Sequence, residues 1–131
     1  MNEISRPQDT SEENQSLWML TVSPTIWAAH FMACYLTAAI WCAKHAGPDG
    51  SLEGVRLAMA AYTAVALAGI GIMAWIGYRR HGYGSEALPH DMDTPGDRHR
   101  FLGFATLLLS GLSAVAVLYV AMVAIFMKTC D

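Results

Sequence analysis

Charge is scarce in this sequence of 131 residues. Only 15% of the residues are charged, whereas 54% are hydrophobic, and the net charge is −3. Soluble domains are about one quarter charged, so this composition excludes an ordinary soluble domain. The sequence also has no basic run, which leaves nucleic-acid binding without electrostatic support. No part of the chain indicates a second domain.

Catalytic signatures are missing as well. The sequence contains no phosphate-binding loop, no H-E-x-x-H motif and no nucleophile with a paired base. The three cysteines, Cys34, Cys42 and Cys130, do not have a metal-type spacing such as C-x-x-C. We therefore expect a protein that is not itself an enzyme, holds no metal and contains no cofactor in this chain alone.

Three long apolar blocks are present, and the charges lie between them. The pattern predicts an all-α integral membrane protein whose three transmembrane helices form an antiparallel bundle over residues 17–131. We expect the spans at residues 24–43, 55–78 and 101–127 and a cytoplasmic loop at 79–100. Residues 1–16 are polar, and they do not show the basic region followed by an apolar core that a signal peptide has. They are therefore predicted to be a disordered, uncleaved tail.

The first span carries an ionisable residue within its apolar run. Ser23 and Pro24 are typical of a helix start, with serine as N-cap and proline as the first helical residue. From there, helical spacing places several polar and aromatic side chains on one face. This predicted interaction face consists of Trp27, His30, Cys34, Thr37 and Trp41.

The role of His30 is the central question, because a histidine within a span is a candidate functional position. The hypothesis favoured by its surroundings is a hydrogen bond between helices. A haem ligand is the alternative, but the other histidines lie at span edges or in loops (His45, His81, His90 and His99). Transport is a further alternative. A proton relay generally needs acidic side chains within the membrane, and the second and third spans contain none. Tyr35 lies just off the His30 face and adds only a phenol to it.

Small residues and hydroxyls mark the other two spans. Ala60, Ala64 and Ala68 recur every four residues, a spacing that lets membrane helices approach closely, and we include them in the interaction face. In the third span one face carries a narrow polar strip, which we interpret as helix packing rather than a transport path. This strip contains Gly103, Thr106, Ser110, Ser113 and Val117.

The charges of the connections predict the orientation. The tail and the 79–100 loop share five arginines, whereas the opposite side has three basic residues. The positive-inside rule then places the N-terminus in the cytoplasm and the C-terminus outside. Asp97 and Arg98 lie near the start of the third span, where an acid favours the positive end of a helix. The loop composition also allows a metal site, but its prolines and glycines favour an irregular, solvated loop.

This orientation brings Cys42 and Cys130 to the same outer side. If the host is a bacterium, that compartment is oxidising, and a disulfide between them is possible. Two unpaired thiols remain the alternative, because the separation of the Cα atoms cannot be read from the sequence.

Two stretches, SPTIWAAHFMACYLTAAIWCAK and TPGDRHRFLGFATLLLSGLSAVAVLYVA, resemble small bacterial three-span membrane proteins associated with haem–copper terminal oxidases. The resemblance implies an accessory subunit or assembly factor of a respiratory complex in the inner membrane. Its partners would be lipid and a larger membrane complex, or further copies of the chain, with no nucleic acid. The alternatives are a haem- or quinone-binding anchor in electron transfer and a small oligomeric transporter. The resemblance assigns no residue roles.

Overall fold

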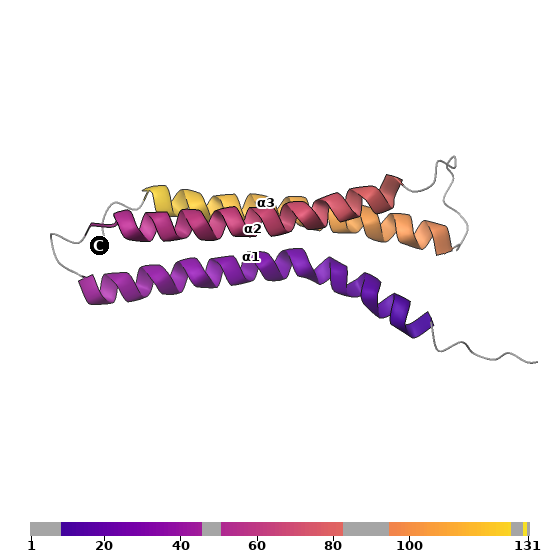
Figure 1. Cartoon of the computed structure of the whole chain (residues 1–131), viewed down its shortest axis with the longest axis horizontal. Coiled ribbons are helices and arrows are strands. Elements are labelled where there is room, and N and C mark those ends of the chain that lie inside the picture. The colour runs from indigo at the N-terminus through magenta and orange to yellow at the C-terminus, as the bar shows by residue number, and fades with distance from the viewer. Residues whose placement is uncertain (1–8, 46–50, 83–94, 127–129, 131) are drawn as a thin grey trace, which may run out of the picture.

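The chain folds into three long helices, as the sequence predicts. The computed structural model describes residues 9–45, 51–82, 95–126 and 130. Helix α1 spans Asp9–His45, α2 spans Glu53–Gly82 and α3 spans Pro95–Phe126. Consecutive helices run antiparallel (Figure 1), and the part of the chain described here contains no strand. The all-α prediction is therefore confirmed.

All three helices are long and apolar enough to cross a bilayer. The candidate spans are Leu17–His45, Glu53–Arg80 and Arg100–Phe126. Each has at least 27 residues, whereas about 20 residues suffice to cross the hydrocarbon core. The protein is thus a multi-pass membrane protein, and its helices extend beyond the core of the bilayer.

The predicted start of the first helix at Ser23 is wrong. Helix α1 already begins at Asp9, so residues 9–16 of the tail that was expected to be disordered are helical, and Pro24 lies inside the helix. A proline removes one backbone hydrogen bond and kinks the helix, and α1 bends away from the other helices towards its N-terminal end (Figure 1). Membrane helices tolerate such a proline because neighbouring groups satisfy the backbone.

The loop expected at residues 79–100 is shorter in the structure. Helix α2 continues to Gly82 and α3 begins at Pro95, so both ends of the expected loop are helical. Proline fits the first helical position because its missing N–H group would have no partner there. Asp97 therefore lies in the first turn of α3, as predicted. Residues 83–94, including His90, lie outside the described residues.

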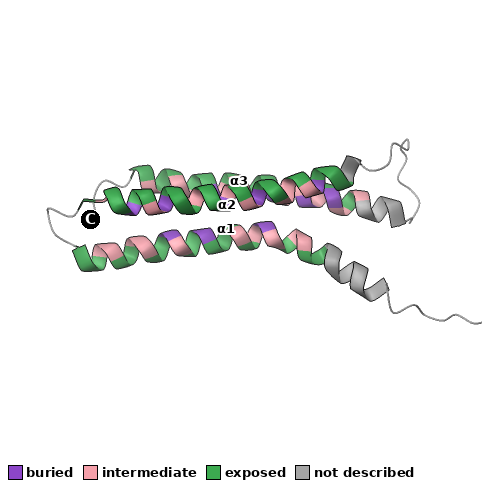
Figure 2. Ribbon diagram, in the orientation of Figure 1, coloured by how far each residue is buried: buried purple, intermediate pink, exposed green. Residues whose placement is uncertain are grey.

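Buried residues are spread along all three helices, between exposed and partly buried ones (Figure 2). Helices α2 and α3 make the most extensive contact, and α1 packs along both of them. Two apolar clusters form the interior. One consists of Cys34, Val55 and Met59, and the other of Ala66, Ile70 and Val117.

The polar strip of α3 faces the interior, which supports its interpretation as a packing surface. All five of its members are buried: Gly103, Thr106, Ser110, Ser113 and Val117. Where α3 carries Gly103, it approaches α2 very closely. A Cβ atom placed on Gly77 would lie 3.1 Å from the backbone oxygen of Gly103. This pair of glycines therefore sets the distance between the two helices near the C-terminal end of α2 and the N-terminal end of α3.

Candidate functional site

A hydrogen-bonded group centred on His30 connects α1 with α2. The Nε2 atom of His30 lies 3.0 Å from the hydroxyl oxygen of Thr63. That hydroxyl donates its only proton to the backbone oxygen of Met59 at 2.7 Å. The Thr63 oxygen must therefore accept a hydrogen bond from Nε2–H, which fixes the tautomer of His30. The favoured hypothesis, a histidine that bonds between helices, matches this contact.

The opposite nitrogen of the same ring has no partner. His30 is only 4% exposed, and its Nδ1 atom is buried without a hydrogen bond. In the tautomer described above, Nδ1 carries a lone pair and no proton. A buried polar atom without a partner costs about 1–3 kcal/mol, so this lone pair is an unusual feature of the interior.

Cys34 lies one turn beyond His30 on the same inward face. It is 5% exposed and is a free thiol. Its Sγ atom lies 3.5 Å from Nε2 of His30, and its side chain packs in one cluster with Met59 of α2. Cys34 thus lies beside His30 of its own helix and packs in one cluster with Met59 of the neighbouring helix.

A second polar contact ties α1 to α3. The hydroxyls of Ser23 and Ser110 lie 2.8 Å apart and are both buried. Ser23 is therefore not a helix cap. Its hydroxyl instead satisfies Ser110 next to the proline bend, while Thr106 bonds within α3 to the backbone oxygen of Leu102 at 2.7 Å.

The remaining members of the predicted α1 face are not equivalent. Trp27 is exposed, and Thr37 and Trp41 are partly buried. The Trp41 ring stacks on His45 with their centroids 4.3 Å apart. The inward surface of α1 is therefore narrower than the predicted face, and Trp27 stands at its edge. Tyr35 is exposed and stacks on Phe31 at 6.3 Å.

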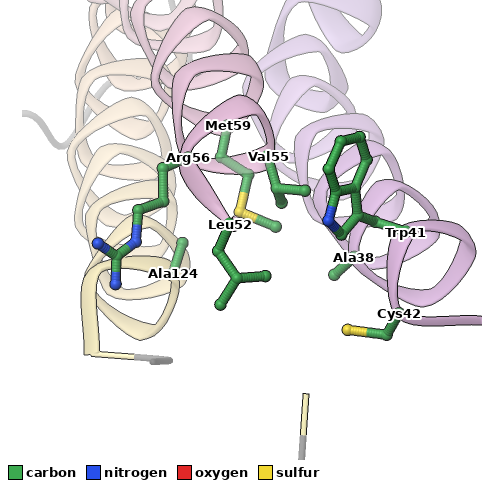
Figure 3. A pocket seen from close by; sticks show the side chains of 8 residues that line it. All are labelled: Ala38, Trp41, Cys42, Leu52, Val55, Arg56, Met59 and Ala124. Carbon is green, nitrogen blue, oxygen red and sulfur yellow. The ribbon is translucent and has the colours of Figure 1, made fainter. Parts of the chain in front are cut away.

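A small cavity lies beside Trp41, between the ends of the helices (Figure 3). Its volume is about 20 Å³, which is enough for one water molecule. The indole Nε1 of Trp41 is buried and has no protein partner. Trp41, Val55 and Met59 are among the side chains around this cavity.

The alanine ladder of α2 remains outside the core. Ala60, Ala64 and Ala68 are all exposed in the single chain. Two of them line an open groove of about 420 Å³ between α2 and α3, which we call the α2–α3 groove. The residues that line it include Ala60, Thr63, Ala64, Leu67, Ala121 and Ala124.

A second open groove lies between α1 and α3. This α1–α3 groove has a volume of about 330 Å³ and is almost entirely apolar. The side chains that line it include Phe31, Cys34, Tyr35, Met59, Val120 and Val123. Cys34 and Met59 therefore border both the protein interior and this groove.

The structure joins Cys42 and Cys130 in a disulfide. Their Cα atoms are 5.6 Å apart, and 88 positions separate them in the sequence. The bond ties the C-terminal segment to the last turns of α1. The sequence left this pairing open, because only the fold shows that the two cysteines meet.

The structure describes the side chains of two histidines, His30 and His45, and they are not placed to hold one haem between them. Both belong to α1, and their 15-residue separation corresponds to about 22 Å along the helix axis, so they cannot flank one haem. Among the described residues, no three His, Cys, Asp or Glu side chains lie together.

Three residues of this site were not singled out in the sequence as functional positions. Thr63 and Met59 lie in an Ala-rich helix, and Ser23 was interpreted as a cap. The only available signal was that Thr63 is the sole serine or threonine of α2.

No family model, curated protein or solved structure matches this chain.

Proposed function

We propose that this membrane protein is a non-catalytic accessory subunit, or a stability factor, of a larger respiratory complex in a bacterial inner membrane. The resemblance described above favours a terminal oxidase as that complex. The observation that carries the proposal is the division between interior and surface. Two pairs of polar side chains, His30 with Thr63 and Ser23 with Ser110, bond across the helices in the interior, whereas both large grooves open outwards.

The interior supports a structural role. His30 bonds to Thr63, and Ser23 bonds to Ser110. Such contacts between helices stabilise membrane proteins by about 0.6 kcal/mol each on average. The hydroxyls of Thr63, Ser23 and Ser110 are engaged in these contacts, so they are not presented to a substrate as they would be in a transport path or an active site.

The outer surface supports docking to a larger membrane protein. Four of the nine residues that line the α2–α3 groove are alanines, and they come from two helices. Small side chains let a further helix approach closely, and close packing is a main source of affinity between membrane helices. The proposed occupant of this groove is one transmembrane helix of the partner complex.

The proposed orientation places the N-terminus in the cytoplasm. Arg79 and Arg80 lie at the end of α2 next to Trp75, and the Arg79 guanidinium lies 5.8 Å from the Trp75 ring centre. An aromatic residue and arginines at one helix end are typical of the cytoplasmic interface. The Cys42–Cys130 disulfide lies at the opposite end, and disulfides persist in oxidising compartments.

Isolation of the tagged chain from native membranes in a mild detergent tests this function. We expect respiratory subunits larger than this chain to copurify in a fixed ratio, with the haem absorbance of the complex. Recovery of the chain alone, or of its homo-oligomer without other subunits, would contradict the proposal. A haem absorbance from the purified chain alone would favour the electron-transfer alternative.

A further inference from the structure

We propose that the bundle binds one anionic phospholipid, with an acyl chain in the α1–α3 groove and the headgroup phosphate beside Arg56. The inference does not rest on the accessory role proposed above. It rests on the length and apolar lining of the groove, on the small cavity that adjoins it and on the charge at that end of the bundle.

The α1–α3 groove has the length of one leaflet of a bilayer. Along α1 it extends from Phe31 to Cys42, which corresponds to about 16 Å along the helix axis. Half of the hydrocarbon core measures about 15 Å. Phe31 is the middle residue of the candidate span Leu17–His45, so the groove covers the half of the membrane on the side of the Cys42–Cys130 disulfide. One acyl chain of that leaflet therefore fits along it.

The lining of this groove favours a hydrocarbon chain over a protein helix. Its surface is almost entirely apolar, so it offers no partner to a polar group. The rings of Phe31 and Tyr35 both line it and stack on each other with their centroids 6.3 Å apart. Large side chains keep the backbone of a neighbouring helix at a distance, because close approach of membrane helices needs small residues. A flexible acyl chain can lie between such side chains.

The groove adjoins the small cavity beside Trp41. Four residues line both of them: Ala38, Cys42, Met59 and Ala124. The indole nitrogen of Trp41 is buried without a protein partner, and it is turned towards α2 (Figure 3). The cavity has room for one water-sized group. An ester oxygen of the lipid, directly or through one water molecule, accepts the hydrogen bond of this N–H group.

Positive charge at this end of the bundle selects an anionic headgroup. Arg56 lines the cavity on the side opposite Trp41 (Figure 3), and its Nη2 atom lies 3.5 Å from the backbone oxygen of Ile125 near the end of α3. Lys44 is a second cation, in the last turn of α1. Among the described residues of this end, Glu53 is the one acid. A guanidinium suits phosphate because its N–H donors match the phosphate oxygens.

Native mass spectrometry of the full chain, purified in detergent and freed of lipid, tests the site. Phosphatidylglycerol and phosphatidylcholine with the same acyl chains are added at equal concentrations. We expect one phosphatidylglycerol per chain, bound about fivefold more tightly than phosphatidylcholine, which is the factor that one basic residue contributes near a membrane surface. Arg56→Gln should abolish this preference while both lipids still bind.

Matched variants of α1 locate the acyl chain. Ala39→Trp, at an exposed position that lines the groove, should abolish the binding of both lipids. Ala29→Trp, at an exposed position that is not among the residues lining the groove, should leave binding unchanged. The helix content and the detergent stability of each variant establish that it is folded. Equal affinity of the wild-type chain for the two lipids, a preference that persists in Arg56→Gln, or undiminished binding by folded Ala39→Trp would overturn the proposal.

Discussion

The hydrogen bond between His30 and Thr63 is the main polar contact between α1 and α2. The imidazole is almost fully buried, and its Nε2–H group donates a hydrogen bond to the Thr63 hydroxyl, with the Cys34 sulfur 3.5 Å from the same nitrogen. In the membrane such a contact is worth about 0.6 kcal/mol on average and at most about 1.7 kcal/mol. This contact stabilises the fold modestly, but it fixes which ring nitrogen carries the proton.

Replacing Thr63 by valine tests that contact with little change in shape. We expect Thr63→Val to lower the free energy of unfolding by about 0.6–1.7 kcal/mol, because the Nε2–H group of His30 loses its acceptor. Unfolding by SDS in mixed micelles measures the difference. The control is Thr25→Val, at an exposed threonine that bonds only within α1, to the backbone oxygen of Thr21 at 2.7 Å. Equal losses for the two variants would show that the contact between helices contributes nothing.

Some residues of the candidate site could be identified from the sequence alone, and others could not. His30 is identified by its position in an apolar run, and the hydroxyl strip of α3 by its helical spacing. Thr63 could not be identified as the partner of His30, because no sequence rule gives the register between two helices. Ser23 followed by Pro24 has the pattern of a helix start, and only the continuation of α1 to Asp9 shows otherwise.

At the scale of the elements, α2 and α3 depend on glycine where they are closest. A Cβ atom at Gly77 would meet backbone atoms of α3 at 3.1 Å and 3.4 Å. Backbone atoms cannot rotate away as a flexible side chain can, so the helices must separate to admit a methyl group. Gly69 is less constrained, because its nearest neighbour is the flexible end of Ile26 at 3.2 Å.

A pair of alanine substitutions tests the close approach. Gly77→Ala should lower the free energy of unfolding by about 1–3 kcal/mol, the usual cost of overpacking. Gly71→Ala is the control, because nothing lies within 4 Å of its added Cβ. There alanine should stabilise the helix by up to about 1 kcal/mol through its higher helix propensity. Unfolding titrations of the two variants should therefore shift in opposite directions; a shift of Gly77→Ala towards higher stability would contradict the packing.

The number of helices could be predicted from the sequence, but the positions of their ends could not. The three apolar runs determine the number and nature of the helices, because a membrane leaves few alternatives to a helix. Their ends are less well determined. The helices extend past the membrane at Asp9, Gly82 and Pro95, where polar residues no longer distinguish a helix from a loop.

At the scale of the whole molecule, the disulfide closes the chain. It links α1 to the C-terminus across 88 positions. In the chain-entropy model, a loop of this length is worth up to about 4.5 kcal/mol. The gain should be smaller here, since helices that stay inserted in the membrane restrict the unfolded chain as well.

Removal of the crosslink gives a test of both stability and orientation. We expect Cys42→Ser/Cys130→Ser to unfold at lower SDS, while Cys34→Ser retains the crosslink and its faster migration on a non-reducing gel. In intact cells, a membrane-impermeant thiol reagent should label Cys130 in the Cys42→Ser variant. Labelling only after the membrane is opened would place this end in the cytoplasm and contradict the proposed topology.

The proposed function requires that a transmembrane helix of a larger membrane complex docks into the α2–α3 groove. Two tryptophan variants at neighbouring positions of α2 test this docking. Ala64 lines the α2–α3 groove, whereas Val65 is 74% exposed and is not among the residues that line this groove. The measurement is the amount of partner subunit that copurifies with each folded, tagged variant. We predict that Ala64→Trp loses most of the partner and that Val65→Trp retains it. Equal recovery with both variants would contradict docking through this groove.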